Sequence, residues 1–324
     1  MLMSIVLFAV GLVLLIKGGD WFVDGATGIA KRFNLPDIVV GATVVSIGTT
    51  LPEVMVSTTG ALQGSGAMAY GNAIGSIICN TALIAAISIV VNPGPVNVKS
   101  MKTPAIFFFA ASAIYCLAAY GLGTFPRWLG FIMLTVFAVY MFMTVRNGLK
   151  NPDAAAEEEE EGGKEKSMGM LLVLLIVGAA VIAVGADLLV EHGQIIAIGL
   201  GVPATVVALL FVALGTSLPE LVTTITSRKK GRASLGVGNV IGANVFNLVL
   251  VSGVAVSLAP FDVPVENELL NTGLNLSLVF DIPVMLLVMS LMIFPAMAKK
   301  KLQRWQGLLL LGIYIAFCVC QFVL

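Results

Sequence analysis

The sequence predicts an all-α polytopic membrane protein whose ten transmembrane helices form two inverted five-helix repeats. The first observation behind this prediction is composition: 58% of the 324 residues are hydrophobic and only 11% are charged, whereas soluble domains carry about 25% charged residues. The second is a mean hydropathy of +1.02, concentrated in long apolar segments. The third is that prolines and polar residues of the first half recur in the second half at a constant spacing.

Ten apolar segments, bounded by charged residues, proline or glycine, account for most of the chain. Each approaches or exceeds the roughly 20 residues that a helix needs to cross a bilayer. They cover residues 2–30, 36–59, 69–91, 104–120, 127–145, 169–190, 203–227, 236–259, 274–294 and 304–323. The long hydrophilic stretch at 147–168, with five consecutive glutamates, is typical of a solvated linker. The chain therefore divides into a first repeat (1–146), an acidic linker (147–168) and a second repeat (169–324).

The two halves are copies of one another. Adding 167 to a residue number in the first half gives its counterpart in the second half: Pro36 matches Pro203, Gly48 Gly215, Pro52 Pro219, Glu53 Glu220, Asn72 Asn239 and Asn80 Asn247. Nine of the 18 residues in 36–53 are identical to their counterparts. Chance similarity between apolar segments would not align the polar residues, so the pattern indicates an internal duplication.

The basic residues predict the orientation in the membrane, because cytoplasmic loops collect lysine and arginine. With ten spans, one side of the membrane receives 16 of the 18 basic residues, including the cluster RKKGR at 228–232. This side is predicted to face the cytoplasm, and the protein to lie in a prokaryotic cell (inner) membrane. The linker is then inside and both termini are outside. Since each repeat has an odd number of spans, the two copies cross the bilayer in opposite directions.

The hexapeptides GTTLPE (48–53) and GTSLPE (215–220) place a proline and a glutamate inside apolar segments. Proline lacks the amide donor and clashes with the preceding turn, so each helix is predicted to break here and to free the carbonyl groups of residues 46–48 and 213–215. A charge at the bilayer centre costs at least about 2.5–3.5 kcal/mol. Carboxylates, hydroxyls and free carbonyls form an all-oxygen environment, which suits calcium or sodium better than zinc or copper.

A second motif follows each hexapeptide, GNAIGSIICN (71–80) and GNVIGANVFN (238–247). At helical spacing Asn72, Ser76 and Asn80 share one face, and glycines beside them allow close packing on the hexapeptide helix. Such a face is often only a packing surface, and one proline-kinked helix with one glutamate can be purely structural. Two symmetric copies with the same glutamate and the same amides make the purely structural interpretation the weaker one.

The paired hexapeptides, each followed by a GNxxG(S/A)xxxN helix, resemble the alpha repeats of sodium/calcium exchangers in the calcium/cation antiporter superfamily. The resemblance covers essentially the whole chain. It implies ten helices in inverted repeats and a secondary active antiporter that exchanges Ca²⁺ for Na⁺ by alternating access, in which the first helix of each repeat slides across the motif helices. It implies no enzyme activity and no cofactor. The expected partners are the lipid bilayer and the transported ions, with no nucleic acid and no obligate protein partner.

The resemblance also implies cation-binding roles at particular positions. Glu53 and Glu220 are the implied central ligands, shared by Ca²⁺ and Na⁺. The remaining implied ligands are Thr49 and Thr216, which complete the Ca²⁺ site mainly through their carbonyls; Thr50, Ser217, Ser76 and the carbonyls of Ser46 and Ala213, which line flanking sodium sites; and Asn80 and Asn247, which lie beside the glutamates.

Two positions depart from the fullest family pattern: Asn247, where some members have an acid, and Ala243, where some have a serine. An antiporter of the same superfamily that uses H⁺, or that depends on K⁺, is therefore the first alternative. A channel that shares the same ligands is a second. An intramembrane enzyme that uses the two carboxylates as acid and base is a distant third, because no nucleophile–base pair or HExxH motif accompanies them.

Overall fold

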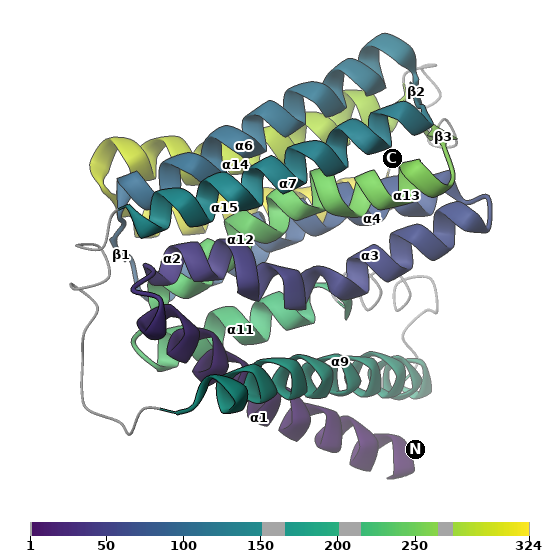
Figure 1. The fold of residues 1–324 in the computed structure, drawn as a ribbon. Coiled ribbons are helices and arrows are strands. Elements are labelled where there is room, and N and C mark those ends of the chain that lie inside the picture. The colour runs from purple at the N-terminus through teal and green to yellow at the C-terminus, as the bar shows by residue number, and fades with distance from the viewer. Residues whose placement is uncertain (1, 151–165, 201–214, 265–274, 324) are drawn as a thin grey trace.

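The computed structural model describes residues 2–150, 166–200, 215–264 and 275–323, and these are almost entirely helical (Figure 1). The first half contains α1 (Leu2–Arg32), α2 (Asp37–Val40), α3 (Ser46–Leu62), α4 (Gly66–Cys79), α5 (Ala86–Val91), α6 (Val98–Cys116) and α7 (Arg127–Leu149). The second half contains α9 (Met168–Gly199), α11 (Leu218–Lys229), α12 (Ala233–Phe246), α13 (Ser252–Leu258), α14 (Ile282–Lys299) and α15 (Arg304–Val323).

Short π-helical segments interrupt or extend several of these helices. They are η1 (Gly41–Val45), η2 (Asn80–Ala85), η3 (Leu117–Leu122), η4 (Asn247–Val251) and η6 (Ser277–Asp281). Segments η1, η2 and η4 join consecutive α-helices into longer spans. Both η2 and η4 begin at the last asparagine of a GNxxG(S/A)xxxN motif, Asn80 and Asn247. Turns of π-helix inside α-helices occur frequently at functional sites.

Nine stretches of the described residues are long and apolar enough to cross a membrane. They are Leu2–Arg32, Asp37–Leu62, Gly66–Val91, Val98–Leu122, Arg127–Leu149, Met168–Gly193, Ala233–Leu258, Ser277–Lys299 and Arg304–Gln321. Each overlaps one predicted segment, so the prediction of an all-α polytopic membrane protein is confirmed. The remaining predicted span, 203–227, lies partly outside the described residues. Ten spans and inverted repeats therefore stay predictions.

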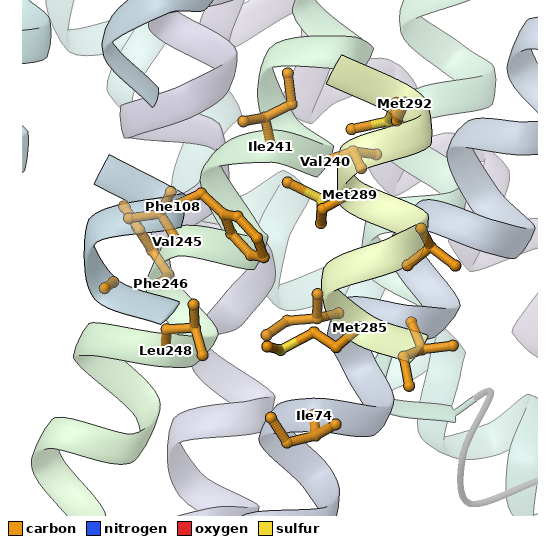
Figure 2. Packing of buried hydrophobic residues seen from close by; sticks show 14 of the residues in the cluster. Ile74, Phe108, Val240, Ile241, Val245, Phe246, Leu248, Met285, Met289 and Met292 are labelled. Carbon is orange, nitrogen blue, oxygen red and sulfur yellow. The ribbon is translucent and has the colours of Figure 1, made fainter. Parts of the chain in front are cut away.

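The hydrophobic core is centred on α12, whose residues 238–246 are all buried. Helix α14 packs beside it and presents Met285, Met289 and Met292 on one face (Figure 2). From the other side, the rings of Phe137 and Tyr140 lie edge-on to the ring of Phe246. Such edge-to-face pairs add about 0.5–1.5 kcal/mol beyond the area that they bury. Helix α12 is thus held on several sides by large side chains.

Glycines let α12 lie directly against residues 38–46 of the first half. A Cβ atom on Gly238 would collide with the carbonyl oxygen of Ile38, and one on Gly242 would come within 2.5 Å of the Cα atom of Ala42. Because residue numbers rise together along this contact, α12 runs parallel to α3. Helix α11 is joined to α12 by a short turn and packs against it, so α11 is antiparallel to α12. The two hexapeptide helices, α3 and α11, therefore run in opposite directions.

Helices α1 and α9 form a second close-packed pair, which lies along the outside of the bundle (Figure 1). A Cβ atom on Gly11 would lie 2.9 Å from the carbonyl oxygen of Gly185, and one on Gly25 would lie 2.7 Å from the amide nitrogen of Leu175. Residue numbers rise along α1 as they fall along α9, so this pair is antiparallel. Its glycines allow backbone to touch backbone, as in close helix pairs within membranes.

Two short antiparallel strand pairs lie at opposite ends of the bundle. Strand β1 (Gly94–Pro95) pairs with β4 (Lys301–Leu302), and β2 (Thr124–Phe125) pairs with β3 (Phe261–Asp262). The beginning of α1 and the end of α15 both lie at the end of the bundle where β2 and β3 pair (Figure 1). Both ends of the described chain are thus on one side, as an even number of spans requires.

The predicted break at the proline is wrong for the first hexapeptide. Helix α3 continues from Ser46 to Leu62 through Pro52. In the second hexapeptide the helix is interrupted at Ser217, and α11 begins at Leu218 with Pro219 in its first turn. Proline costs little there, because the amide groups of a first turn have no partner within the helix. Helix α7 also extends to Leu149, so the first residues of the predicted linker are helical, and 151–165 lie outside the described residues.

A largely buried ion pair fixes the turn after α11 to the start of α2. The Arg232 guanidinium lies 3.3 Å from the Asp37 carboxylate, and the two side chains are 14% and 3% exposed. Lys230 makes a more exposed pair with Asp24 at 2.7 Å, at 28% and 40% exposure. Removing one partner of a buried pair costs about 3–5 kcal/mol, whereas exposed pairs contribute about 0–1 kcal/mol.

Arg232→Met is therefore expected to lower the melting temperature of the detergent-purified protein more than Lys230→Met does. The two variants remove one positive charge each from the same turn, and Lys230→Met loses more contacts, since Lys230 also reaches the carboxylate and the backbone oxygen of Asp20; a larger effect of Arg232→Met would therefore come from the burial of its ion pair. Melting is followed with a fluorescent dye that does not react with thiols, or by the loss of the monodisperse size-exclusion peak after heating. Equal melting temperatures for the two variants would show that the Arg232–Asp37 pair contributes no more than an exposed one.

Candidate cation site

The two hexapeptide glutamates occupy the interior of the protein. Glu53 lies on α3 and Glu220 on α11, and both are 0% exposed. None of their four carboxylate oxygens has a hydrogen-bond partner among the described residues, and the two carboxylates interact electrostatically with each other. Two buried, like-charged groups without polar partners are costly unless a cation or protons neutralise them.

Amides and hydroxyls of the same motifs are also buried without partners. Asn80 is the first residue of η2, and Asn247 is the first residue of η4. Both are 0% exposed, and neither the nitrogen nor the oxygen of either amide has a partner in the described structure. The hydroxyls of Thr50 and Ser217 are buried and unpartnered in the same way. Most buried polar groups in proteins are hydrogen-bonded, and the exceptions in the described structure include six of the predicted ligands, among other residues.

The elements that carry these groups cross between the two halves. Helix α3 contacts η4, and α11 contacts η2. Glu53 and Asn247 therefore come from neighbouring elements, as do Glu220 and Asn80. Cys79, which precedes Asn80, lies beside Ser217 and within electrostatic range of Glu220. The tertiary structure thus brings oxygen-bearing groups of both motifs from both halves into one region.

Ser46 and Thr49 have partners, unlike the groups above. The Ser46 hydroxyl donates to the carbonyl oxygen of Gly41 at 2.8 Å and to that of Asn239 at 3.0 Å. The Thr49 hydroxyl donates to the side-chain oxygen of Asn239 at 3.1 Å. The Glu220 carboxylate is within reach of the same hydroxyl, but only the contact with Asn239 has the geometry of a hydrogen bond.

For the remaining predicted ligands the structure gives only burial and position in the chain. Ser76 is buried on α4, one turn before Asn80. Thr216 is half-buried just before the interruption at Ser217. Ala213 lies outside the described residues. Asn239 was not among the predicted ligands, although GN opens the second motif in both halves; the repeat of that dipeptide was the signal that would have pointed to it.

The donor set suits a hard cation. Its atoms are carboxylate, amide and hydroxyl oxygens, and among the described residues no group of three or more His, Cys, Asp or Glu side chains could by itself hold a metal ion. Calcium takes six to eight oxygen ligands with flexible geometry, which two carboxylates with amide and hydroxyl oxygens around them can supply. The unpartnered carboxylate oxygens of Glu53 and Glu220 are the atoms that such a cation would satisfy.

Comparison with known proteins places the chain in a family. The sodium/calcium exchanger protein family matches residues 3–146 and 170–323. A membrane protein of Methanocaldococcus jannaschii, MJ0091, is 34% identical over 95% of this chain and 94% of its own length. The sodium/calcium exchanger MaX1 of Methanosarcina acetivorans is 30% identical over 98% of both chains. A solved structure of the sodium-calcium exchanger NCX_Mj superposes with a TM-score of 0.79 at 32% identity, covering 98% of both chains. The chain therefore belongs to the sodium/calcium exchanger family and is a membrane transporter, not an enzyme.

Proposed function

We propose that this protein is a secondary active antiporter that exchanges Ca²⁺ for Na⁺ by alternating access, with Glu53 and Glu220 as the shared cation ligands. The observation that carries the proposal is the burial of both carboxylates without protein partners, on antiparallel helices from the two halves. A divalent cation matches their charge, and two Na⁺ ions or protons match it equally well. The naming of relatives as sodium/calcium exchangers supports the choice of ions.

Competition for one pair of carboxylates makes the exchange obligatory. In the Ca²⁺-bound state Glu53 and Glu220 bind the ion together with oxygens of Thr49 and Thr216. In the sodium-bound state the flanking positions are lined by Thr50, Ser217, Ser76 and the carbonyls of Ser46 and Ala213, with Asn80 and Asn247 in the middle. Without either cation the site would hold two uncompensated charges, which is costly. Net leak is suppressed because an empty site does not readily change the side to which it opens.

Movement of the α1 and α9 pair is the proposed route to alternating access. The pair packs outside the bundle that holds the glutamates, and glycines bring its two backbones into contact. Phe22 of α1 meets Gly48 at the start of the first hexapeptide, where a Cβ atom would lie 2.9 Å from the end of the Phe22 ring. A shift of α1 would therefore uncover or cover the region next to the predicted site.

The inverted-repeat architecture is part of this proposal, with repeats at 1–146 and 169–324. The opposite directions of α3 and α11 support it, as do the π-helical segments that begin at both Asn80 and Asn247. The Lys/Arg distribution supports a cytoplasmic linker at 147–168 and outward-facing termini in the cell (inner) membrane. An inverted repeat places equivalent residues of both copies around a shared site near the midplane.

An antiporter driven by H⁺, or dependent on K⁺, is the second candidate. It is favoured by one specific observation: the second half has Asn247 and Ala243 at positions that offer neither a carboxylate nor a hydroxyl. The Ca²⁺ ligands Glu53 and Glu220 remain in place under either candidate. The difference lies only in the ion that returns.

Flux into proteoliposomes separates these candidates. Purified protein is reconstituted with Na⁺ inside, and Ca²⁺ uptake is measured at clamped pH without K⁺, then with K⁺, and then with a pH gradient in place of the Na⁺ gradient. Uptake driven by the Na⁺ gradient alone is the expected result. Uptake that needs K⁺, or that follows only the pH gradient, would replace Na⁺ exchange with the corresponding alternative. Saturable exchange of labelled for unlabelled Ca²⁺ distinguishes all of these from a channel.

A further inference from the structure

Asn239 touches two of the proposed ligand residues but is not itself a proposed ligand. Its side-chain oxygen accepts hydrogen bonds from the Thr49 hydroxyl at 3.1 Å and the Ser46 hydroxyl at 3.3 Å. Its backbone oxygen accepts from Ser46 at 3.0 Å. Asn239 is 0% exposed, so no bulk water competes for these bonds.

The position of Asn239 is set by the closest helix contact in the core. The neighbouring Gly238 touches the carbonyl of Ile38, and Gly242 touches Ala42 and the Ser46 hydroxyl. Any larger residue at either glycine would force α12 away from η1 and α3. The amide of Asn239 is therefore held against the start of α3 by backbone packing and not by its own hydrogen bonds alone.

Asn72, the counterpart of Asn239, contacts the same helix on the other side of the hexapeptide. Its side-chain nitrogen donates to the Ser57 hydroxyl at 2.8 Å and to the backbone oxygen of Glu53 at 3.2 Å. The hexapeptide, in which Pro52 cannot donate to the carbonyl of Gly48, thus meets an amide of α12 at Thr49 and an amide of α4 at Glu53. These contacts hold α3 from two neighbouring helices, although neither amide donates to the Gly48 carbonyl itself.

The direction of the Thr49 proton has a chemical consequence. A hydroxyl has one proton and two lone pairs, and it can face a cation only if its proton points elsewhere. Thr49 lies beside the Glu220 carboxylate, which would be the strongest alternative acceptor for that proton. With the proton donated to Asn239, the Thr49 oxygen presents lone pairs to the site, and the Glu220 oxygens stay free for the cation.

We infer that Asn239 is a positioning residue for cation binding, which accepts the Thr49 hydroxyl proton and so keeps the Thr49 hydroxyl oxygen, beside its carbonyl, and the Glu220 carboxylate available to Ca²⁺. The inference rests on the proposed function, because it concerns affinity at the same site. Residues that orient metal ligands in this way typically change metal affinity by 10–100-fold when they are replaced.

A double-mutant cycle on equilibrium binding of radiolabelled Ca²⁺ to the purified protein tests this inference. Asn239→Leu, which removes the acceptor at similar volume, is expected to weaken Ca²⁺ binding by about tenfold or more. In the Thr49→Val background the same substitution is expected to change binding by less than about twofold, because no Thr49 proton is left to orient. In the Thr49→Ser background, which keeps the hydroxyl, the large effect should return.

Asn244→Leu is the matched control on the same helix. Asn244 is equally buried and donates to the hydroxyl of Thr81, so it reports the general cost of losing a core amide. Its effect on Ca²⁺ binding should be the same in the wild-type and Thr49→Val backgrounds. If Asn239→Leu were also additive with Thr49→Val, the positioning role would be refuted.

Asn239→Asp covers the case in which the leucine variant does not fold. It keeps an oxygen acceptor at the same place, so its Ca²⁺ binding should be no weaker than that of the wild type; binding as weak as expected for the leucine variant would contradict the inference. Ca²⁺ binding to the wild type distinguishes failure of the proposed function from failure of the positioning role. No Ca²⁺ binding by the wild type would refute the proposed function, whereas normal wild-type binding with an additive cycle would refute only the role of Asn239.

Discussion

Replacing either Glu53 or Glu220 with glutamine is expected to abolish Ca²⁺ transport and leave a folded protein. Glutamine has nearly the same shape as glutamate but cannot supply the charge that a dehydrated divalent cation requires. Because both carboxylates are fully buried without protein partners, neutralising one also removes an uncompensated charge from the interior. We therefore expect Ca²⁺ uptake to fall by at least about 100-fold, in line with the loss of a charged ligand worth about 3 kcal/mol or more, with no decrease in melting temperature.

Uptake of radiolabelled Ca²⁺ into proteoliposomes measures this effect for Glu53→Gln, Glu220→Gln and Asp281→Asn. Asp281 is the matched control, because it is an acid in an apolar helix that already has a partner, the Gln321 amide at 2.7 Å. Asp281→Asn is expected to keep uptake within a few-fold of the wild type. Near-normal uptake by both glutamate variants would overturn the shared site, even if sodium proved to be the coupling ion.

Gly18→Leu is expected to stop turnover but to leave Ca²⁺ binding intact. A Cβ atom at Gly18 would already lie 2.9 Å from the amide nitrogen of Ile182 on α9. Backbone cannot move aside as a flexible side chain can, so the leucine must push α1 away from α9, at a cost of about 1–3 kcal/mol or more. If this pair moves during transport, the strain changes the barrier, and about 1.4 kcal/mol corresponds to a tenfold change in rate. The carboxylates lie on other helices, so their affinity for Ca²⁺ should change little.

Gly169→Leu is the control for this experiment, because Gly169 is on α9 but a Cβ atom there would meet nothing within 4 Å. Both variants add the same side chain to the same helix pair. The comparison uses initial rates of Ca²⁺ uptake together with equilibrium Ca²⁺ binding in detergent. Full transport by Gly18→Leu would argue that the α1–α9 contact is static, and loss of binding as well as transport would indicate misfolding instead of blocked movement.

Much of the candidate site follows from residue types and spacing. The constant spacing of 167 residues singled out Glu53, Glu220, Asn80 and Asn247, and all four are fully buried side chains without protein partners. The physical reason is that carboxylates and amides are costly in a membrane interior. A carboxylate or amide that occurs there twice, at equivalent positions, therefore indicates a function. Nine of the ten predicted spans overlap a membrane-length apolar helix among the described residues. They could be predicted because the length of an apolar segment is a property of the sequence alone.

The course of α3 through Pro52 was not predictable in this way. From the sequence alone, an internal proline predicts a helix break, because a hydrogen bond within the helix is lost. In a membrane protein, neighbouring helices can satisfy the backbone groups that a proline frees. Here Asn72 bonds the Glu53 carbonyl and Asn239 bonds the Thr49 hydroxyl, and Asn239 is 190 residues away from Thr49 in sequence.

By itself, the sequence determined which segments are apolar enough to enter a membrane, which polar residues are duplicated within them, and that their oxygens suit a hard cation. These properties depend on composition, spacing and ligand chemistry. Only the tertiary structure decided that α3 and α11 lie against each other, that α3 stays helical through its proline, and that the Thr49 hydroxyl donates to Asn239. Those outcomes depend on glycine contacts and hydrogen bonds between residues far apart in the chain, which no local pattern specifies.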